Sequence, residues 1–303
     1  VFLGTNLKCA SCHDSFINDL KLDDAYALAA VFAEKPLELH RCNKPTGRTA
    51  RIGFLFPSLG SLTTTDSRPD RLKRLADLLV TRKNGRFTRT IVNRLWATLI
   101  GRGLVEPVDE MERPAWNPDL LDWLAEDLAD HGFNLKHTLQ TICRSRAYQS
   151  EAIAAPRKVK TYIFGGPYVR RMTAEQFVDA VAALTQTPLV ADKLMAKRDG
   201  RGQGGQLPQL QAVVNEDKQD SRPLLIRAAF IMPDPLQRAL GRPNREQIVT
   251  RRDSLATMLQ AMELTNGSTL DKALQQGAAH WLPAANRNLN TVLDTLFQTG
   301  FSR

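Results

Sequence analysis

The spacing of apolar side chains along most of the chain predicts α-helices rather than β-strands. Beyond residue 66, apolar residues recur at every third or fourth position, which places them on one face of a helix. We expect the strongest helices at residues 70–80, 87–100, 118–131, 134–143 and 173–184, and weaker ones at 224–231, 254–264, 269–276 and 289–297. Few stretches alternate apolar and polar residues. The pattern therefore predicts a mainly α fold with little β-structure.

Local signals at the ends of several segments support these helices. Asn117 is a capping residue, and it is followed by Pro118 at the first helical position and by an acid in the first turn. Thr173 and Gln176 have the spacing of a capping box. Gly101 suits a left-handed helix end.

The first 66 residues have a different pattern. A short helix over residues 23–34 is closed by Pro36, and a loop-rich stretch with several prolines and glycines follows. The polar run at residues 63–67 is typical of a linker or an exposed turn. We therefore expect two domains, residues 1–66 and 67–303, with the first docked on a multi-helix second.

The net charge of the chain says more about its possible binding partners than its length does. The chain has 303 residues, 43% of them hydrophobic, and a formal net charge of +9. No run of about eighteen apolar residues is present, so we expect no membrane span. A basic surplus either favours acidic partners, such as an acidic redox protein, an anionic glycan or nucleic acid, or only maintains solubility. Many basic residues lie at 68–113, but no DNA-reading motif accompanies them, so we do not expect nucleic acid.

One short motif near the start of the chain carries the clearest chemistry. Cys9 and Cys12 are three positions apart, and His13 follows directly. Two thiols at this spacing can bond to the two vinyl groups of haem while the adjacent imidazole reaches the iron. The motif predicts covalently attached haem c and a place outside the cytoplasm. His40 is the nearest candidate for a distal iron ligand, and Met172 is another.

Other roles for the cysteines stay open from the sequence alone. Cys9, Cys12, His40 and Cys42 could supply the four N and S ligands of a structural zinc site. A thioredoxin-like redox pair lacks its expected β-strand, and a Cys9–Cys12 disulfide would be strained. Cys143 lies within an apolar helical pattern, so we expect it to be a small buried residue.

Several further clusters have a structural interpretation that we favour. Asp109, Glu110 and Glu112 could be a catalytic carboxylate pair, but acids grouped in a loop are more often solvated or capping. His131 and His137 flank a helix junction, where we expect a capping or surface role rather than metal binding.

Three tryptophans could form a sugar-stacking platform. They are Trp96, Trp116 and Trp123. Trp96 and Trp123 lie within helical patterns, so we expect both in the core instead.

Several longer stretches together resemble a known family. They are FLGTNLKCASCHD, LELHRCNKPTG, IVNRLWATLIGRGLVEPVDEM, NPDLLDWLA, RRMTAEQFVDA and DPLQRALGRPNREQIVT. They resemble the planctomycete-type secreted cytochrome c proteins, in which a haem-motif domain precedes a helical planctomycete-specific domain of unknown function. The resemblance implies export, haem attachment at Cys9, Cys12 and His13, and further sequence missing at both ends. It assigns no role to the segment from His40 to Cys42.

The leading hypothesis is an exported c-type haem protein of the periplasm, cell surface or extracellular space. It would transfer electrons to or from a partner protein in support of redox metabolism there, rather than act as a catalyst. One alternative is a non-redox or carbohydrate-associated scaffold with a structural zinc site. Another is a haem enzyme whose distal iron face is open to small molecules or peroxide.

Overall fold

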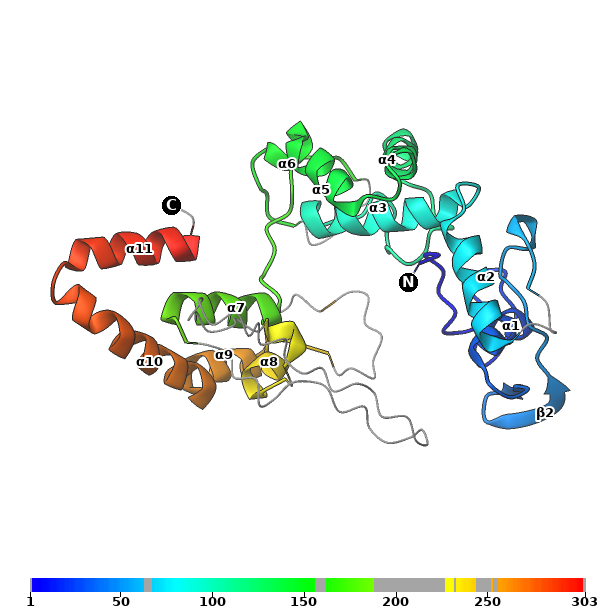
Figure 1. Ribbon diagram of the computed structural model, residues 1–303, viewed down its shortest axis with the longest axis horizontal. Coiled ribbons are helices and arrows are strands. Elements are labelled where there is room, and N and C mark those ends of the chain that lie inside the picture. The colour runs from blue at the N-terminus through cyan, green and yellow to red at the C-terminus, as the bar shows by residue number, and fades with distance from the viewer. Residues whose placement is uncertain are drawn as a thin grey trace, which may run out of the picture. The chain divides into compact units, whose positions relative to one another are not determined.

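The protein is mainly α-helical and divides into two compact units (Figure 1). The computed structural model describes residues 2–62, 67–155, 162–187, 227–231, 233–243, 252 and 256–301. The first unit spans Val1–Val169 and the second spans Arg170–Arg303. Within the described ranges the only sheet has two strands, so the predicted fold class is confirmed.

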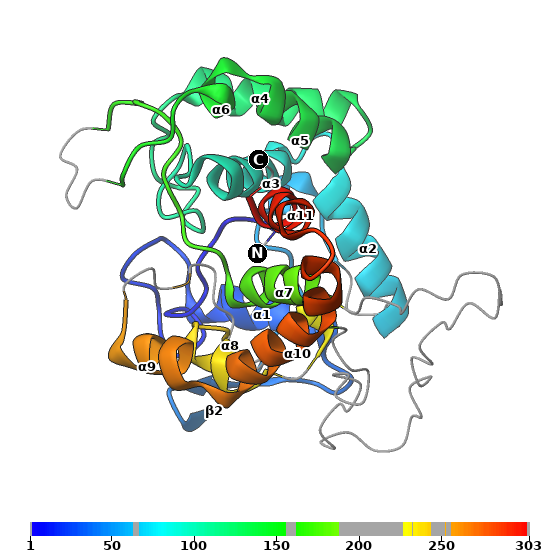
Figure 2. The same cartoon turned by 90° about the vertical axis from the view of Figure 1, so that its left-hand side faces the viewer.

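In its described residues the first unit contains α-helices, one 3-10 turn and a β-hairpin (Figures 1 and 2). They are α1 (Leu22–Phe32), β1 (Glu38–Arg41), β2 (Lys44–Thr49), η1 (Pro57–Leu59), α2 (Arg68–Val80), α3 (Gly85–Ile100), α4 (Pro118–Asp130), α5 (Leu135–Arg144) and α6 (Arg146–Gln149). Each strongly patterned segment of this unit forms its predicted helix. The short α6 was not predicted.

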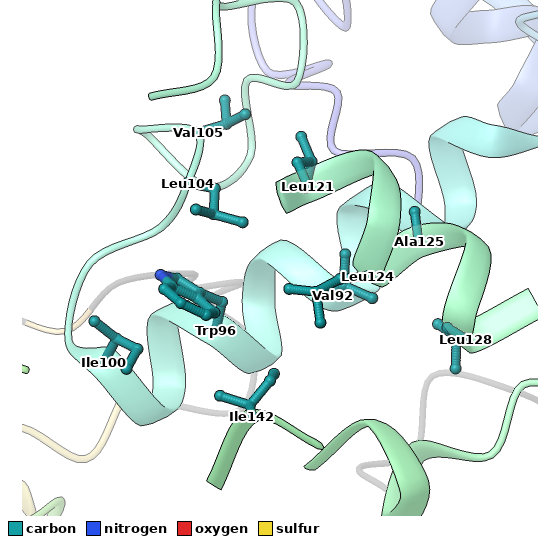
Figure 3. Packing of buried hydrophobic residues seen from close by; sticks show 10 residues of the cluster. All are labelled: Val92, Trp96, Ile100, Leu104, Val105, Leu121, Leu124, Ala125, Leu128 and Ile142. Atoms are coloured by element: carbon teal, nitrogen blue, oxygen red, sulfur yellow. The ribbon is translucent and has the colours of Figure 1, made fainter. Parts of the chain in front are cut away.

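The main core of this unit forms where α3, α4 and α5 meet (Figure 3). The side chains that fill it are Val92, Trp96, Ile100, Leu104, Val105, Leu121, Leu124, Ala125, Leu128 and Ile142. α3 and α4 each contribute residues three or four positions apart, as an amphipathic helix does when it buries one face, and α5 contributes Ile142. This packing makes α3 the central support of the helical body.

The predicted helix ends are confirmed by their hydrogen bonds. The side chain of Asn117 accepts from the backbone N–H of Leu120 at 3.0 Å. Gly101 ends α3 with φ of 92°, a left-handed conformation that glycine adopts without steric cost.

A smaller core joins α1 to α2 across the domain boundary predicted after residue 66. Val31, Phe54 and Leu62 from the first segment pack with Leu75 and Leu78 of α2. Compact packing in the first unit therefore continues past the predicted boundary.

Two expectations about buried side chains are corrected. Trp96 is 4% exposed and lies in the core as predicted, but Trp123 is 55% exposed. At about 100° per residue, Trp123 lies roughly 200° around α4 from the buried Leu121. Cys143 is half-buried on α5 rather than fully buried.

The stretch expected to be a loop contains an antiparallel hairpin. Strands β1 and β2 pair with His40 opposite Pro45. Every side chain of β2 is exposed, and in β1 only Leu39 is buried. A hairpin without a buried face shows no alternating hydrophobic pattern, so periodicity could not reveal it.

The second unit has its own helices and a small core. Its elements are α7 (Ala174–Thr185), η3 (Ala228–Phe230), α8 (Pro235–Ala239), α9 (Met258–Asn266), α10 (Ser268–Ala285) and α11 (Leu289–Phe301). The helices predicted at 173–184, 269–276 and 289–297 are present, and those at 269–276 and 289–297 are longer than predicted. Parts of the segments predicted at 224–231 and 254–264 lie outside the described residues.

Val178, Ala228 and Leu236 form the buried core of this unit. No helix in the described part of the chain has both the length and the apolar composition of a membrane span.

Candidate haem-attachment site

The Cys9–His13 motif forms a single tight turn. The backbone N–H groups of Cys12 and His13 both donate to the carbonyl oxygen of Cys9, each at 3.1 Å, and Ser11 N–H donates to Leu7 at 2.9 Å. Ala10 between the two cysteines is fully buried and anchors the turn. The four cysteines of the chain are free thiols, with Cys9 half-buried and Cys12 exposed. The sequence-predicted cysteines therefore lie on one turn together with the histidine.

The His13 ring is fixed by a backbone contact. Its Nδ1 lies 2.7 Å from the carbonyl oxygen of Asp14. A carbonyl oxygen only accepts, so the neutral ring must carry its proton on Nδ1 and present a lone pair at Nε2. The Asp14 side chain in turn accepts from the N–H of Leu22 at 3.0 Å, at the start of α1. The contact with the Asp14 carbonyl oxygen fixes the orientation of the His13 ring.

Exposed apolar side chains follow the motif directly. Phe16 is 89% exposed, and its ring lies 4.7 Å from the His13 ring. The neighbouring Ile17 is also exposed. Large apolar side chains left this open next to a candidate ligand offer contact area for an apolar macrocycle.

The β-hairpin lies against the motif. The N–H of Cys42, just after β1, donates to the carbonyl oxygen of Cys12 at 2.9 Å. His40 is half-buried on β1, and its carbonyl oxygen accepts from the hydroxyl of Tyr26 at 3.3 Å. The hairpin therefore brings the backbone of Cys42 next to the motif in space. The spacing of these residues in the sequence did not require this contact.

The ligand atoms proposed for zinc do not gather. Across the described residues, the only group of three His, Cys, Asp or Glu ligand atoms within 4.8 Å of one another comes from Asp127, His131 and His137. Cys9, Cys12, His40 and Cys42 form no such group, although all four are described. Met172, the other distal candidate, is exposed and belongs to the second unit.

The chain just before the motif is clamped to the helical body. The N–H of Met111 donates to the carbonyl oxygen of Gly4 at 2.9 Å. Arg86 of α3 donates to the carbonyl oxygen of Leu3 at 2.6 Å and to the Thr5 hydroxyl at 2.8 Å. The loop and helix that hold this segment lie more than eighty residues further along the chain, so no local pattern could predict the contact.

The acidic cluster considered as a catalytic pair is neutralised by arginines. Each acid has its own partner: Asp109 with Arg94, Glu110 with Arg113, and Glu112 with Arg86. These pairs hold the loop to α3 and to itself. The arrangement fits a structural role, as expected from the loop position.

Several of the basic residues at 68–113 also pair with acidic side chains. Arg82 pairs with Asp130 and Arg89 pairs with Asp122, each at 2.5 Å, while Arg68 pairs with Glu34 of the N-terminal region at 3.0 Å. These arginines therefore form ion pairs with acidic side chains of the same unit.

Comparison with known proteins identifies the family. Residues 70–303 match PSD1, described as a protein of unknown function (DUF1553), and residues 1–36 match PSCyt2, also described as a protein of unknown function (DUF1549). No curated protein and no solved structure matches the chain. Both matched families are planctomycete-type, which confirms that part of the predicted resemblance. Because the first match covers well over half of the sequence, the chain belongs to the PSD1 family of planctomycete-type proteins of unknown function.

Proposed function

We propose that this protein is an exported c-type haem protein that transfers electrons. The observation that carries the proposal is the single turn holding Cys9, Cys12 and His13, in which the His13 Nδ1 is tied to a carbonyl oxygen. When bound, the haem would supply one-electron chemistry at its iron. Cys9 and Cys12 would hold it through thioether bonds, and His13 Nε2 would face the iron.

The surroundings of the turn support this assignment. The exposed ring of Phe16 beside His13 offers apolar contact to one part of the cofactor. Clamping of the preceding segment by Arg86 and Met111 keeps the turn in one position, which is what a constant distance to a redox partner requires. The net charge of +9 favours an acidic partner protein, and an anionic glycan is a second class that the charge allows. His40 is the proposed distal ligand.

The test is the pyridine haemochrome spectrum of protein made with a cytochrome c maturation system and extracted with acid–acetone. We expect a haem c spectrum that survives extraction and is lost in Cys9→Ala/Cys12→Ala. The matched control is Cys143→Ala, which removes a thiol in α5 and should leave the spectrum intact. A correctly exported protein that is colourless after maturation would overturn the proposal.

A second measurement separates electron transfer from open-site chemistry. The reduced protein should resist carbon monoxide if a distal ligand occupies the iron, and His40→Ala should then bind it. Carbon monoxide binding by the unmodified protein would favour a haem enzyme with an open distal face.

A further inference from the structure

Three ligand-type side chains meet at the junction of α4 and α5. Asp127 lies in the last turn of α4, and His131 follows at the helix end. Gly132 and Phe133 then reverse the chain with φ of 62° and 59°, and α5 begins within two residues. This turn brings His137, in the first turn of α5, back beside Asp127.

The distances from the carboxylate oxygen to the two ring nitrogens match those of a tetrahedral metal centre. Asp127 Oδ1 lies 3.2 Å from His131 Nδ1 and 3.3 Å from His137 Nε2. For ligands about 2.0–2.1 Å from a zinc ion, tetrahedral geometry separates neighbouring ligand atoms by roughly 3.3–3.4 Å. All three ligand atoms also lie within 4.8 Å of one another. The carboxylate oxygen therefore already stands at about the right separation from both ring nitrogens.

Both ring nitrogens lie beside the same carboxylate, and because the rings are nearly parallel, one ring must turn out of the stack for both lone pairs to point at one ion. The two imidazoles stack with centroids 3.7 Å apart and an interplanar angle of 17°. The Asp127 side chain is only 14% exposed, whereas that of His131 is 48% exposed. The His131 ring is therefore the most exposed part of the cluster, and an ion could reach the cluster from this side.

The geometry points to a divalent transition-metal site held by Asp127, His131 and His137, with zinc as the ion that fits best. Two imidazole nitrogens and one carboxylate oxygen are ligands that zinc accepts, and the open side provides a fourth position for water. The Thr141 hydroxyl lies 3.5 Å from His137 Nε2, the ring atom that would bind the ion. On binding, His131 Nδ1 would exchange its 2.8 Å contact with the Asp127 carbonyl oxygen for the ion. The site joins α4 to α5 and does not depend on haem attachment.

The test is isothermal titration calorimetry with zinc chloride on the metal-stripped full-length chain. We expect one zinc ion per chain, with affinity at least tenfold weaker in Asp127→Asn, His131→Gln and His137→Gln. The matched controls are His280→Gln, which changes an exposed histidine on α10, and Cys42→Ser, which removes a thiol near the haem motif. Both should bind zinc like the unmodified protein. Absence of zinc binding, or binding unchanged in His137→Gln, would overturn the proposal.

X-ray absorption of the zinc-loaded, unmodified protein identifies the ligand atoms directly. This measurement needs no substituted protein, so it does not depend on whether a variant folds. We expect scattering from two imidazoles and oxygen, with no sulfur. A zinc–sulfur shell would assign the ion to the cysteines instead and would overturn the site at the α4–α5 junction.

Discussion

Asn93 links the central helix α3 to the loop that follows it, and removal of its side chain should destabilise the first unit. The side chain is fully buried on α3. Its Nδ2 donates to the carbonyl oxygen of Val105 at 3.0 Å, and its Oδ1 accepts from the N–H of the same residue at 3.0 Å. The amide thus completes both backbone hydrogen bonds of one buried loop residue. That loop continues to Met111, whose N–H holds Gly4.

The expected cost follows from what Asn93→Ala leaves behind. Val105 is 1% exposed, so water cannot replace the lost partners of its N–H and C=O groups. Each buried group left without a partner costs about 1–3 kcal/mol, which gives about 2–6 kcal/mol for the two. A domain's total stability is about 5–15 kcal/mol, so the loss should be large.

Urea unfolding followed by far-ultraviolet circular dichroism measures this difference. The matched control is Asn43→Ala, which removes an exposed amide in the hairpin turn and should change stability by less than about 0.5 kcal/mol. A loss below about 0.5 kcal/mol for Asn93→Ala, with an unchanged slope against urea, would refute the reasoning. It would mean that the loop finds other partners.

Three further changes test other parts of the fold. Gly4→Ala should lower the unfolding midpoint in urea by the equivalent of about 1–3 kcal/mol, because Gly4 has φ of 55° and an added methyl would lie 2.2 Å from a facing side-chain carbon. Gly277→Ala should cost about 1–3 kcal/mol in the second unit, since its methyl would lie 2.6 Å from the Cβ of Thr185, and calorimetry should show the second unit melting earlier. A hydrogen bond from Arg252 lowers the pKa of Glu175. This pair should therefore stabilise the second unit at pH values above the ordinary glutamate pKa. The stabilisation should be lost as the pH falls through the lowered pKa of Glu175. Acid unfolding of Glu175→Gln should lack that part of the pH dependence, and a curve identical to that of the unmodified protein would contradict the assignment.

Helices were predictable because their signals are local. The caps at Asn117 and Thr173 and the stop at Gly101 each depend on residues within one turn, and each makes the expected hydrogen bond. The Cys9–His13 motif is equally local, and the structure folds it as one turn. Trp123 shows that the same periodicity could have been used further, since its angle on α4 already places it opposite the buried leucines.

What could not be predicted depends on contacts between distant segments. The hairpin brings Cys42 to Cys12 although none of the side chains of β2 is buried. The cluster at Asp127 required the turn between α4 and α5. Its first pair has the visible i,i+4 spacing of helical neighbours, but only the chain reversal at Gly132 and Phe133 adds His137. From the sequence, the two histidines were therefore best interpreted as capping or surface residues.

The docking of the motif also bears on how the two family matches relate to each other. The segment that matches PSCyt2 contains the Cys9–His13 turn, and the PSD1 match begins at residue 70. Arg86 and Met111, both within the PSD1 match, hold the backbone of Leu3 and Gly4, within the PSCyt2 match. The core shared by Val31 and the α2 leucines adds an apolar contact between the same two segments. An N-terminal segment with so few buried residues of its own gains a fixed geometry from this support. The helical body therefore determines where the Cys9–His13 turn is presented.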